Sequence, residues 1–515
     1  MAIPDVKIVQ IGGGLGRPSP GEDYYSGLLF YTNTLPSGFS SSDRIKQVLS
    51  VVQAEQLGIL ADYSDETQAQ FTIQYDTIGN TGEWVEFYYQ EPINNVFLGR
   101  YKVLSTQNTS GLQCDGLAAA INALTNTHGY VAVSNGTDMV TVTVRKGLGI
   151  YPNSGSPLTW VQNASPVMFI IANQQSSSGV ASLLAQWHYH IAEYYRLNVT
   201  GNLTVMFAAL SGNTFDFAEL GLMTNYVEGK LRQVGVYLAN TDTFASASDI
   251  VSAANLLQTE CAALTVLHAP MSVIVGTDMS GISDLTTLQD LSALSDPKVS
   301  VTIGQDGSNL GYQIFKAQGY SITDVGAQLG MLSSLAVNES TAYVEKCNYT
   351  NGLELSVPAY ANGVKVDFIA DTNLLAQLDN YRYIFLRRLF GKNGTYINNN
   401  HCAVTFTSDY AYQNDNRVFD KMSRLLYAGY VSFLSGTIRL KSDGTFKDED
   451  VAYLTSLGRD ALSDMLRNGE ISALDVVVDP TQKILQTNKL VVAVSVVPDG
   501  VARNIEIDLG FKTSL

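Results

Sequence analysis

Charged side chains are scarce in this sequence. Asp, Glu, Lys and Arg make up 15% of the 515 residues, whereas about a quarter is usual for globular proteins. Basic residues are the scarcer kind, with 31 Lys and Arg against 48 Asp and Glu, which gives a formal net charge of -17. No basic cluster is longer than Arg387-Arg388. Because nucleic-acid binding needs basic patches that neutralise phosphates, we expect no nucleic acid among the partners.

Cysteines and long hydrophobic runs are also few. The four cysteines lie far apart and form no CxxC pair, so the sequence indicates neither a disulfide framework nor a thiolate metal site. No apolar run approaches the ~20 residues that span a bilayer, and the first residues lack the basic start and apolar stretch of a signal peptide. We therefore expect buried free thiols, no membrane insertion and synthesis in a cytoplasm. The cysteines are Cys114, Cys261, Cys347 and Cys402.

No motif provides a reaction centre. The glycine-rich run at residues 12–16 lacks the Lys-Ser/Thr of a phosphate-binding loop, and no helix is predicted directly after it. His188 and His190 are two residues apart on a predicted helix, which directs them to different faces and prevents a shared metal. His401 and Cys402 are adjacent in an extended segment and point in opposite directions. We expect no catalytic, cofactor-binding or metal-ligating residues, no cofactor and no enzymatic activity.

The hydrophobic patterns predict several domains. From about residue 200 to residue 337, continuous apolar strands alternate with helices, which is typical of a largely parallel sheet covered on both faces. Before this region, a strand is predicted at residues 24–31 and a helix, capped by Asp43, at residues 43–58. Residues 70–160 combine strands, a short Ala-rich helix and a hairpin. The predicted fold class is multidomain, α/β and α+β. We assign residues 19–69 and 161–400 to an α/β body and residues 70–160 to a β-rich inserted domain.

The last hundred residues organise the chain. A helix capped by Asn414 and Asp415 carries one apolar stripe, and its charged residues occupy the other faces. A second helix, at residues 448–466, opens with three acids that favour a helix N-terminus and stops at Asn468-Gly469. Strands follow at residues 474–478 and 489–497. Residues 401–497 are therefore predicted to form a helix-helix-strand-strand domain.

Both ends of the chain predict strands that can detach. Apolar residues from Ile505 to Phe511 alternate with polar ones, which indicates a strand with one apolar face. This strand could fold back onto its own sheet through a turn at residues 498–500, or it could be donated to a neighbouring copy. A second short strand precedes the glycine-rich run, and two detachable end strands favour a polymer. The expected inter-subunit strand residues are Val6, Ile8, Ile505, Ile507, Leu509 and Phe511, within arms at residues 1–18 and 498–515; the expected hinges are Gly12, Gly13, Gly14, Gly16, Pro498 and Gly500.

The ends and the C-terminal domain resemble contractile tail sheath proteins. The resemblance covers roughly the first 60 and the last 110 residues, and its weight comes from the order of segments along the chain. The segments that carry it are Asp409-Tyr410-Ala411-Tyr412, Arg417, Asp420-Lys421, residues 466–471, residues 491–498, Asn504-Ile505-Glu506-Ile507, and residues 3–16 followed by residues 23–29.

The resemblance implies a structural subunit that polymerises as stacked hexameric discs around an inner tube. Terminal strands of neighbouring copies would complete the sheet of each C-terminal domain, and contraction would drive the tube through a cell envelope. The implied partners are other copies of the chain, the inner tail tube protein, and baseplate and tail terminator proteins. The implied location is a virion tail or contractile particle assembled in a bacterial host cytoplasm. The insertion at 70–160 would lie on the outer surface, and residues 448–466 would face the tube through Lys447, Arg459 and Arg467.

Two other classes of protein stay open. An α/β enzyme with an appended β domain would need a convergent acid, base or nucleophile set; Asp278 and Asp306 follow predicted strands, but aspartate is also common in ordinary turns. A capsid or surface-layer protein would share the Gly-, Asn- and Thr-rich composition. It does not predict detachable strands at both ends.

Overall fold

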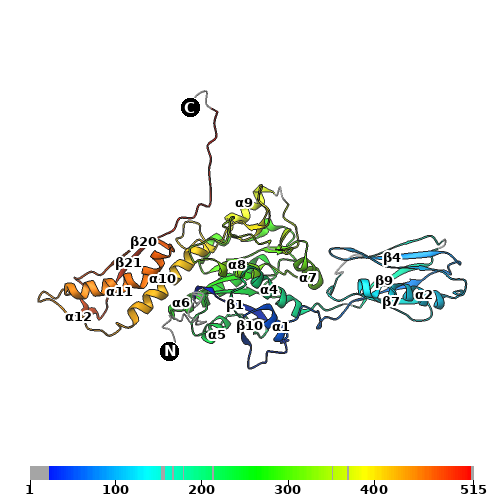
Figure 1. Cartoon of the computed structure of the whole chain (residues 1–515), viewed down its shortest axis with the longest axis horizontal. Helices are drawn as coiled ribbons and strands as arrows, with labels where there is room; N and C mark the ends of the chain where they lie inside the picture. Colours follow the sequence, from blue (N-terminus) through cyan, green and yellow to red (C-terminus); the bar gives the residue numbers. More distant parts are fainter. Residues whose placement is uncertain are drawn as a thin grey trace, which may run out of the picture.

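The computed structural model is elongated, with a central body between two smaller parts. It describes residues 22–151, 157–164, 167–177, 179–210, 214–350, 352–367 and 371–511. Figure 1 shows the body in the middle, the inserted module on the right, and the C-terminal domain on the left. The last residues leave the junction of body and C-terminal domain as a long arm (Figure 1).

The body is built on a six-stranded sheet. Its order is β14-β12-β11-β1-β10-β2, and every neighbouring pair is parallel except β10 with β2. This confirms the predicted largely parallel sheet. The strands are β1 (Tyr25–Tyr31), β2 (Ile45–Val48), β10 (Asn202–Ala208), β11 (Gln233–Tyr237), β12 (Ser272–Gly276) and β14 (Val299–Val301).

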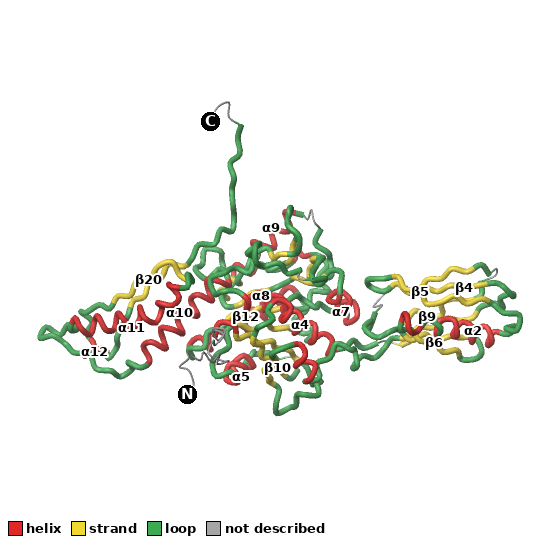
Figure 2. Tube along the Cα trace, in the orientation of Figure 1, coloured by secondary structure: helices red, strands yellow, loops and turns green. Residues whose placement is uncertain are grey.

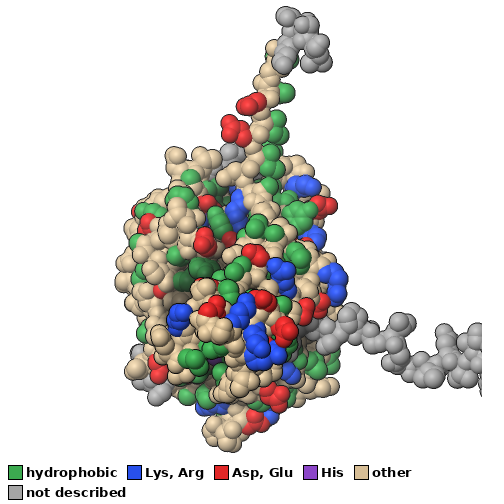
Figure 3. All heavy atoms as spheres, turned by 90° about the vertical axis from the view of Figure 1, so that its left-hand side faces the viewer, with side chains coloured by type: hydrophobic (Ala, Val, Ile, Leu, Met, Phe, Trp, Pro, Cys, Tyr) green, Lys and Arg blue, Asp and Glu red, His purple; other side chains and the backbone are tan. Residues whose placement is uncertain are grey.

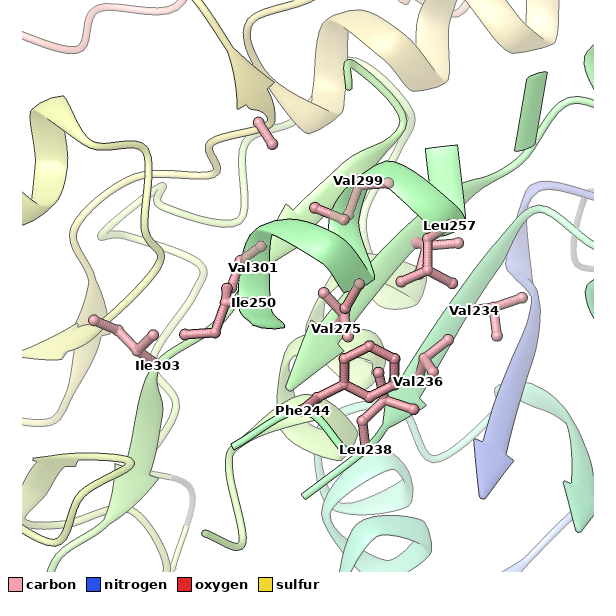
Figure 4. Close-up of a cluster of buried hydrophobic side chains, with 14 of the residues drawn as sticks. Val234, Val236, Leu238, Phe244, Ile250, Leu257, Val275, Val299, Val301 and Ile303 are labelled. Carbon is pink, nitrogen blue, oxygen red and sulfur yellow. The ribbon is translucent and has the colours of Figure 1, made fainter. Parts of the chain in front are cut away.

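Helices cover both faces of this sheet, which is why its strands are apolar along their whole length. On one face, Val234 and Val236 of β11 pack with Ile250 and Leu257 of α6 (Figure 4). On the other face, Leu28 of β1 lies in a second cluster. The helices are α5 (Glu219–Tyr226) and α6 (Ala247–Val266) on the first face, and α4 (Leu183–Leu197) and α8 (Val325–Ser334) on the second.

One helix prediction in the body is wrong. The segment expected as a helix at residues 43–58 begins as β2, and the helix α1 (Val51–Gln56) starts only after Ser50, whose side chain accepts a hydrogen bond from the Gln53 amide. The apolar residues that suggested the helix fit a sheet edge equally well, and pairing of Val48 with Leu203 of β10 decides between the two.

Short elements complete the body. Helix α7 was not predicted. The elements are β13 (Ser295–Asp296), β15 (Gly304–Asp306), α7 (Leu310–Gln318), β16 (Pro358–Tyr360), α9 (Thr372–Asn380), β17 (Leu386–Arg387), β18 (Tyr396–Ile397) and β19 (Ala403–Val404).

The inserted module has two sheets and its own hydrophobic core. Figure 2 shows that most of the module is strand. Its sheet orders are β6-β7-β3-β9 and β5-β4-β8. Strands β8 and β9 pair with β4 and β3, so the module includes strands beyond residue 160, and the segment at 167–171 belongs to it rather than to the body. The elements are β3 (Gln70–Tyr75), β4 (Trp84–Gln90), β5 (Asn95–Lys102), α2 (Ser110–Asn122), α3 (Thr125–His128), β6 (Val131–Ser134), β7 (Met139–Thr143), β8 (Leu158–Gln162) and β9 (Phe169–Ser177).

The C-terminal domain has the predicted helix-helix-strand-strand order. Helix α11 (Asp448–Arg467) ends before Gly469, whose positive φ of 70° suits glycine. Helix α10 (Gln413–Val431) starts at an N-cap of Tyr412, so Asn414 and Asp415 lie in its first turn and do not cap it. The side chain of Asn414 accepts a hydrogen bond from Asn400 of the body instead. The remaining elements are β20 (Ile471–Val477), α12 (Ile484–Thr487) and β21 (Ala493–Pro498).

A close helix crossing in the body makes a testable prediction. A Cβ added to Gly326 of α8 would overlap the backbone carbonyl of His190 in α4. We expect Gly326→Ala to lower the free energy of unfolding by ~1–3 kcal/mol, because α8 must move away from α4. Chemical denaturation followed by circular dichroism measures this change.

The matched control is Gly221→Ala in α5, where the nearest atom to the new Cβ is the flexible Glu260 carboxylate at 3.4 Å. This variant should be unchanged or more stable by up to ~1 kcal/mol, because alanine favours helix. Equal effects of the two substitutions would contradict the assigned packing of α4 on α8.

Candidate functional site

The C-terminal arm, residues 499–511, projects into solvent. Within the described residues it forms no strand, although the alternation of its side chains is that of one. Ile505 and Ile507 are each 79% exposed, and Leu509 and Phe511 are exposed as completely as in an unfolded chain. Figure 3 shows hydrophobic side chains along one side of the arm and acidic ones along the other. The arm therefore does not fold back onto its own sheet in this structure.

The sheet of the C-terminal domain has open edges. In the described part of the chain it consists of β20 and β21 alone, paired antiparallel with an irregularity between Ile471 and Ala473. A two-stranded sheet is marginally stable on its own, and each open edge presents unpaired backbone N–H and C=O groups. Helices α10 and α11 cover one face, where Met465 and Leu462 are buried. The domain can therefore receive a further strand.

An apolar groove runs beside β21. It has a volume of about 610 Å³ and lies between α10 and β21. Phe419 and Met422 line it from the helix, and Val494 and Val496 line it from the strand. Phe419 is 40% exposed although it lies in the predicted apolar stripe of α10. The groove is thus a partly uncovered hydrophobic surface next to a free strand edge.

Of the other predicted strand and hinge residues, some lie outside the described residues and others lie in or next to β21. Val6, Ile8 and the glycines from Gly12 to Gly16 lie outside the described residues. Pro498 is the last residue of β21, where it pairs with Ile471, so it belongs to the sheet and not to the connection. Gly500 is exposed, and a Cβ there would meet nothing within 4 Å.

The predicted tube contacts lie on α11, away from the groove. Lys447 is the exposed N-cap of the helix. Arg459 pairs with Asp475 at 3.4 Å, and Arg467 pairs with Asp464 at 2.7 Å. Cationic and acidic side chains are intermixed on this side of the molecule (Figure 3). The helix therefore presents a mixed surface rather than a positive one.

The charged side of α10 is buried against the body. Asp420 pairs with Lys298 at 2.5 Å, and both side chains are at most 10% exposed. Lys421 pairs with Asp23 and with Glu470, each at 2.7 Å. Burial raises the pKa of Asp420, while Lys298 favours its charged form. Periodicity did not reveal this interface because its partners lie far away along the chain.

Arg417 completes this charged interface through backbone carbonyls of the body. Its guanidinium donates to the backbone carbonyls of Leu335 at 3.1 Å and Ala336 at 3.2 Å. Burial lowers its pKa to about 10. The C-terminal domain is therefore attached to the body by specific polar contacts with fixed geometry.

The side chains that the sequence suggested as possible reactive groups are buried or hydrogen-bonded within the fold. Burial lowers the pKa of His190 to about 3 and raises the pKa of the Cys402 thiol to about 11. His401 contacts Asp379 at 2.8 Å, and Asp306 accepts hydrogen bonds from the amides of the turn that follows it. All four cysteines are free and buried, as predicted.

The described residues contain neither a cluster suited to a metal nor a membrane-spanning helix. Across the described ranges, no three His, Cys, Asp or Glu side chains are grouped to hold a metal. No helix in the described part of the chain is long and apolar enough to cross a bilayer.

Comparison with known proteins identifies a family. Residues 159–401 match the family described as DUF2586, N-terminal domain, and residues 409–515 match DUF2586, C-terminal domain. No curated protein matches the chain.

Three solved structures, each with 12% sequence identity, are similar to part of the chain. One is the baseplate of the anti-feeding prophage, with a TM-score of 0.41 over 63% of this chain and 80% of that one. The second is the PVC sheath complex of an extracellular contractile injection system in the contracted state, with a TM-score of 0.42 over 64% and 81%. The third is the anti-feeding prophage baseplate in the contracted state, with a TM-score of 0.40 over 64% and 85%.

The charged interface makes a prediction about stability. Lys298→Met leaves the Asp420 carboxylate buried without its cation, so we expect a loss of roughly 3–5 kcal/mol in the free energy of unfolding. Lys298→Met combined with Asp420→Leu removes both charges and should recover most of that loss. Chemical denaturation measures both variants.

Lys441→Met is the matched control, because its pair with Asp448 is largely exposed. Its effect should not exceed about 1 kcal/mol. A Lys298→Met effect as small as that of the control would show that the pair does not hold the domain.

Proposed function

We propose that this chain, which belongs to the DUF2586 family, is a structural subunit of a contractile tail sheath. Copies assemble as stacked hexameric discs around an inner tube, and the assembly shortens to drive the tube through a cell envelope. The observation that carries this proposal is that one chain presents both an uncovered arm whose side chains alternate as in a strand with one apolar face and an open sheet edge beside an apolar groove.

The donor and the acceptor have matching chemistry. An added strand beside β21 pairs its backbone with the open edge and inserts alternate side chains into the groove. Ile505, Ile507 and Leu509 are the side chains that enter, and burying each one contributes about 1.5–3 kcal/mol. Their alternation matches a surface formed by Val494 and Val496, which point to the same side of β21.

Donor and acceptor on one chain give a head-to-tail contact. Contacts of this kind close into rings or extend as helices, depending on the rotation between neighbours. A disc of six copies and a helical stack of discs are the two products that the resemblance to sheath proteins implies. The strand predicted at the N-terminus, which contains Val6 and Ile8, provides a second link between copies.

The donated strands allow the assembly to change shape while its copies stay connected. The main-chain pairing of a donated strand persists when rigid bodies rotate about the connecting segments. The inserted module lies on the outside of the cylinder, and α11, with Lys447, Arg459 and Arg467, faces the tube. The partners are further copies, the inner tube protein, and baseplate and terminator proteins, in a tail particle assembled in a bacterial cytoplasm.

Removing the arm tests assembly directly. We expect deletion of residues 504–515 to leave a folded chain that no longer polymerises, because the groove then has no occupant. Light scattering measures the assembly, circular dichroism checks the fold, and electron microscopy shows whether cylinders form. Deletion of residues 1–11 should have the same effect. Normal cylinders from either deletion would overturn the proposed role of that arm.

A single charge tests the direction of the arm's apolar face. Ile507→Asp places a carboxylate in the groove at a cost on the order of several kcal/mol per site, so polymer yield should collapse. Glu506→Gln changes a residue on the opposite face of the same strand and should leave the yield unchanged. Sedimentation of assembled material compares the two variants. Equal yields would mean that the groove does not receive this face.

A further inference from the structure

The root of the C-terminal arm, residues 499–503, is held by contacts at two points. At the first, the Asp499 carboxylate accepts hydrogen bonds from Ser472 Oγ at 2.6 Å and from Asn338 Nδ2 at 2.8 Å. At the second, the Arg503 guanidinium donates to the side-chain oxygen of Asn399 at 2.7 Å, and it makes two further bonds of the same kind. Those two bonds go to Asn400 at 2.9 Å and to Asn414 at 3.0 Å.

An aromatic ring strengthens the second point. The Arg503 guanidinium carbon lies 3.4 Å from the centre of the Tyr412 ring. Arg382 lies 4.9 Å from the centre of the same ring, is itself buried, and donates to the Ala411 carbonyl. Cations are attracted to the face of an aromatic ring. The body, the start of α10 and the arm therefore meet at Tyr412.

These two points restrict where the arm can go. A chain that leaves β21 at Pro498 must reverse within the next few residues to lie along the free edge of the same strand. Residues 499–503 are the segment that would have to reverse, and both of its ends are fixed. Val501 and Arg503 also line the groove from its rim. The arm then continues away from the domain (Figure 1).

We infer that Arg503 is a positioning residue that prevents the arm from filling its own groove and so reserves the groove for the arm of a second copy. The inference rests on the proposed function, because it assumes that the arm is the groove's occupant. It also places the flexible point of the arm at Asn504, after the fixed segment, whereas the sequence suggested Pro498 and Gly500.

The test compares crosslinking within one chain and between two chains. Ile507→Cys marks the arm and Val494→Cys marks the groove, and the four native cysteines are buried. The doubly substituted chain is treated with a short bismaleimide at high dilution, and peptide mass spectrometry detects the intrachain product. The two singly substituted chains, one isotope-labelled, are mixed at assembly concentration to detect the interchain product. Both measurements are made with Arg503 and with Arg503→Ala.

With Arg503 present we expect interchain product and no intrachain product. With Arg503→Ala we expect intrachain product at high dilution and at least a tenfold fall in polymer yield. Intrachain crosslinking at the same rate in both backgrounds would overturn the role of Arg503. Absence of the interchain product with Arg503 present would instead overturn strand donation, and with it the proposed function.

Three controls keep the result interpretable. Arg100→Ala removes an exposed arginine of the inserted module and should behave like the unmodified chain. Arg503→Lys keeps the charge but loses the planar fork of donors, so it should give an intermediate amount of intrachain product. Tyr412→Leu removes the ring while leaving Arg503 in place, and it should act in the same direction as Arg503→Ala. Unchanged melting temperatures confirm that the variants fold. If Arg503→Ala does not fold, Tyr412→Leu serves as the test in its place.

Discussion

One constraint governs this molecule: a chain cannot leave both an apolar strand and an open sheet edge uncovered without a tendency to cover them. The arm exposes Ile505, Ile507 and Leu509, and β21 presents unpaired backbone groups beside an apolar groove. The first surface is unfavourable in water because of its apolar area, and the second presents backbone groups, hydrated in the free chain, with which a further strand can pair. In the proposed assembly the two surfaces are covered together, and the fixed root of the arm favours pairing with another copy.

The attachment of the C-terminal domain matters for the same reason. A donated strand can transmit a movement only if the domain that receives it is rigidly connected to its own body. Here the connection is made by Lys298 with Asp420, by Lys421 with Asp23, and by Arg417 with backbone carbonyls. Buried ion pairs contribute little net stability compared with apolar packing, but they demand particular geometry. An interface of this kind fixes orientation more than it adds affinity.

The inserted module is a separate case. It has its own core of residues such as Phe71, Phe87 and Tyr130, and it lies at the end of the molecule opposite the C-terminal domain (Figure 1). None of its described residues lines the groove. Its position is compatible with a surface that assembly leaves exposed.

The sequence by itself determined the parallel sheet of the body, the order of elements in the C-terminal domain and the alternation in the arm. These features depend on local spacing: 3.6 residues for α11, two residues for Ile505 to Phe511, and continuous apolar runs for β11 and β12. Local spacing failed where two structures fit one pattern, as at residues 45–48, where pairing with β10 selects a strand over a helix. It also placed the end of the inserted module too early, because β8 and β9 are recognised only by the strands they pair with.

Only the tertiary structure decided which polar residues are buried and where the arm is held. Asp420 and Lys298 are 122 residues apart in the chain, and Arg503 binds Asn399 from a distance of 104 residues. The spacing of the charges on α10 separates them from its apolar stripe, but it reveals no opposing surface. An amphipathic pattern predicts which side of a helix or strand is apolar. Whether the polar side is buried depends on residues from distant parts of the chain that folding brings against it.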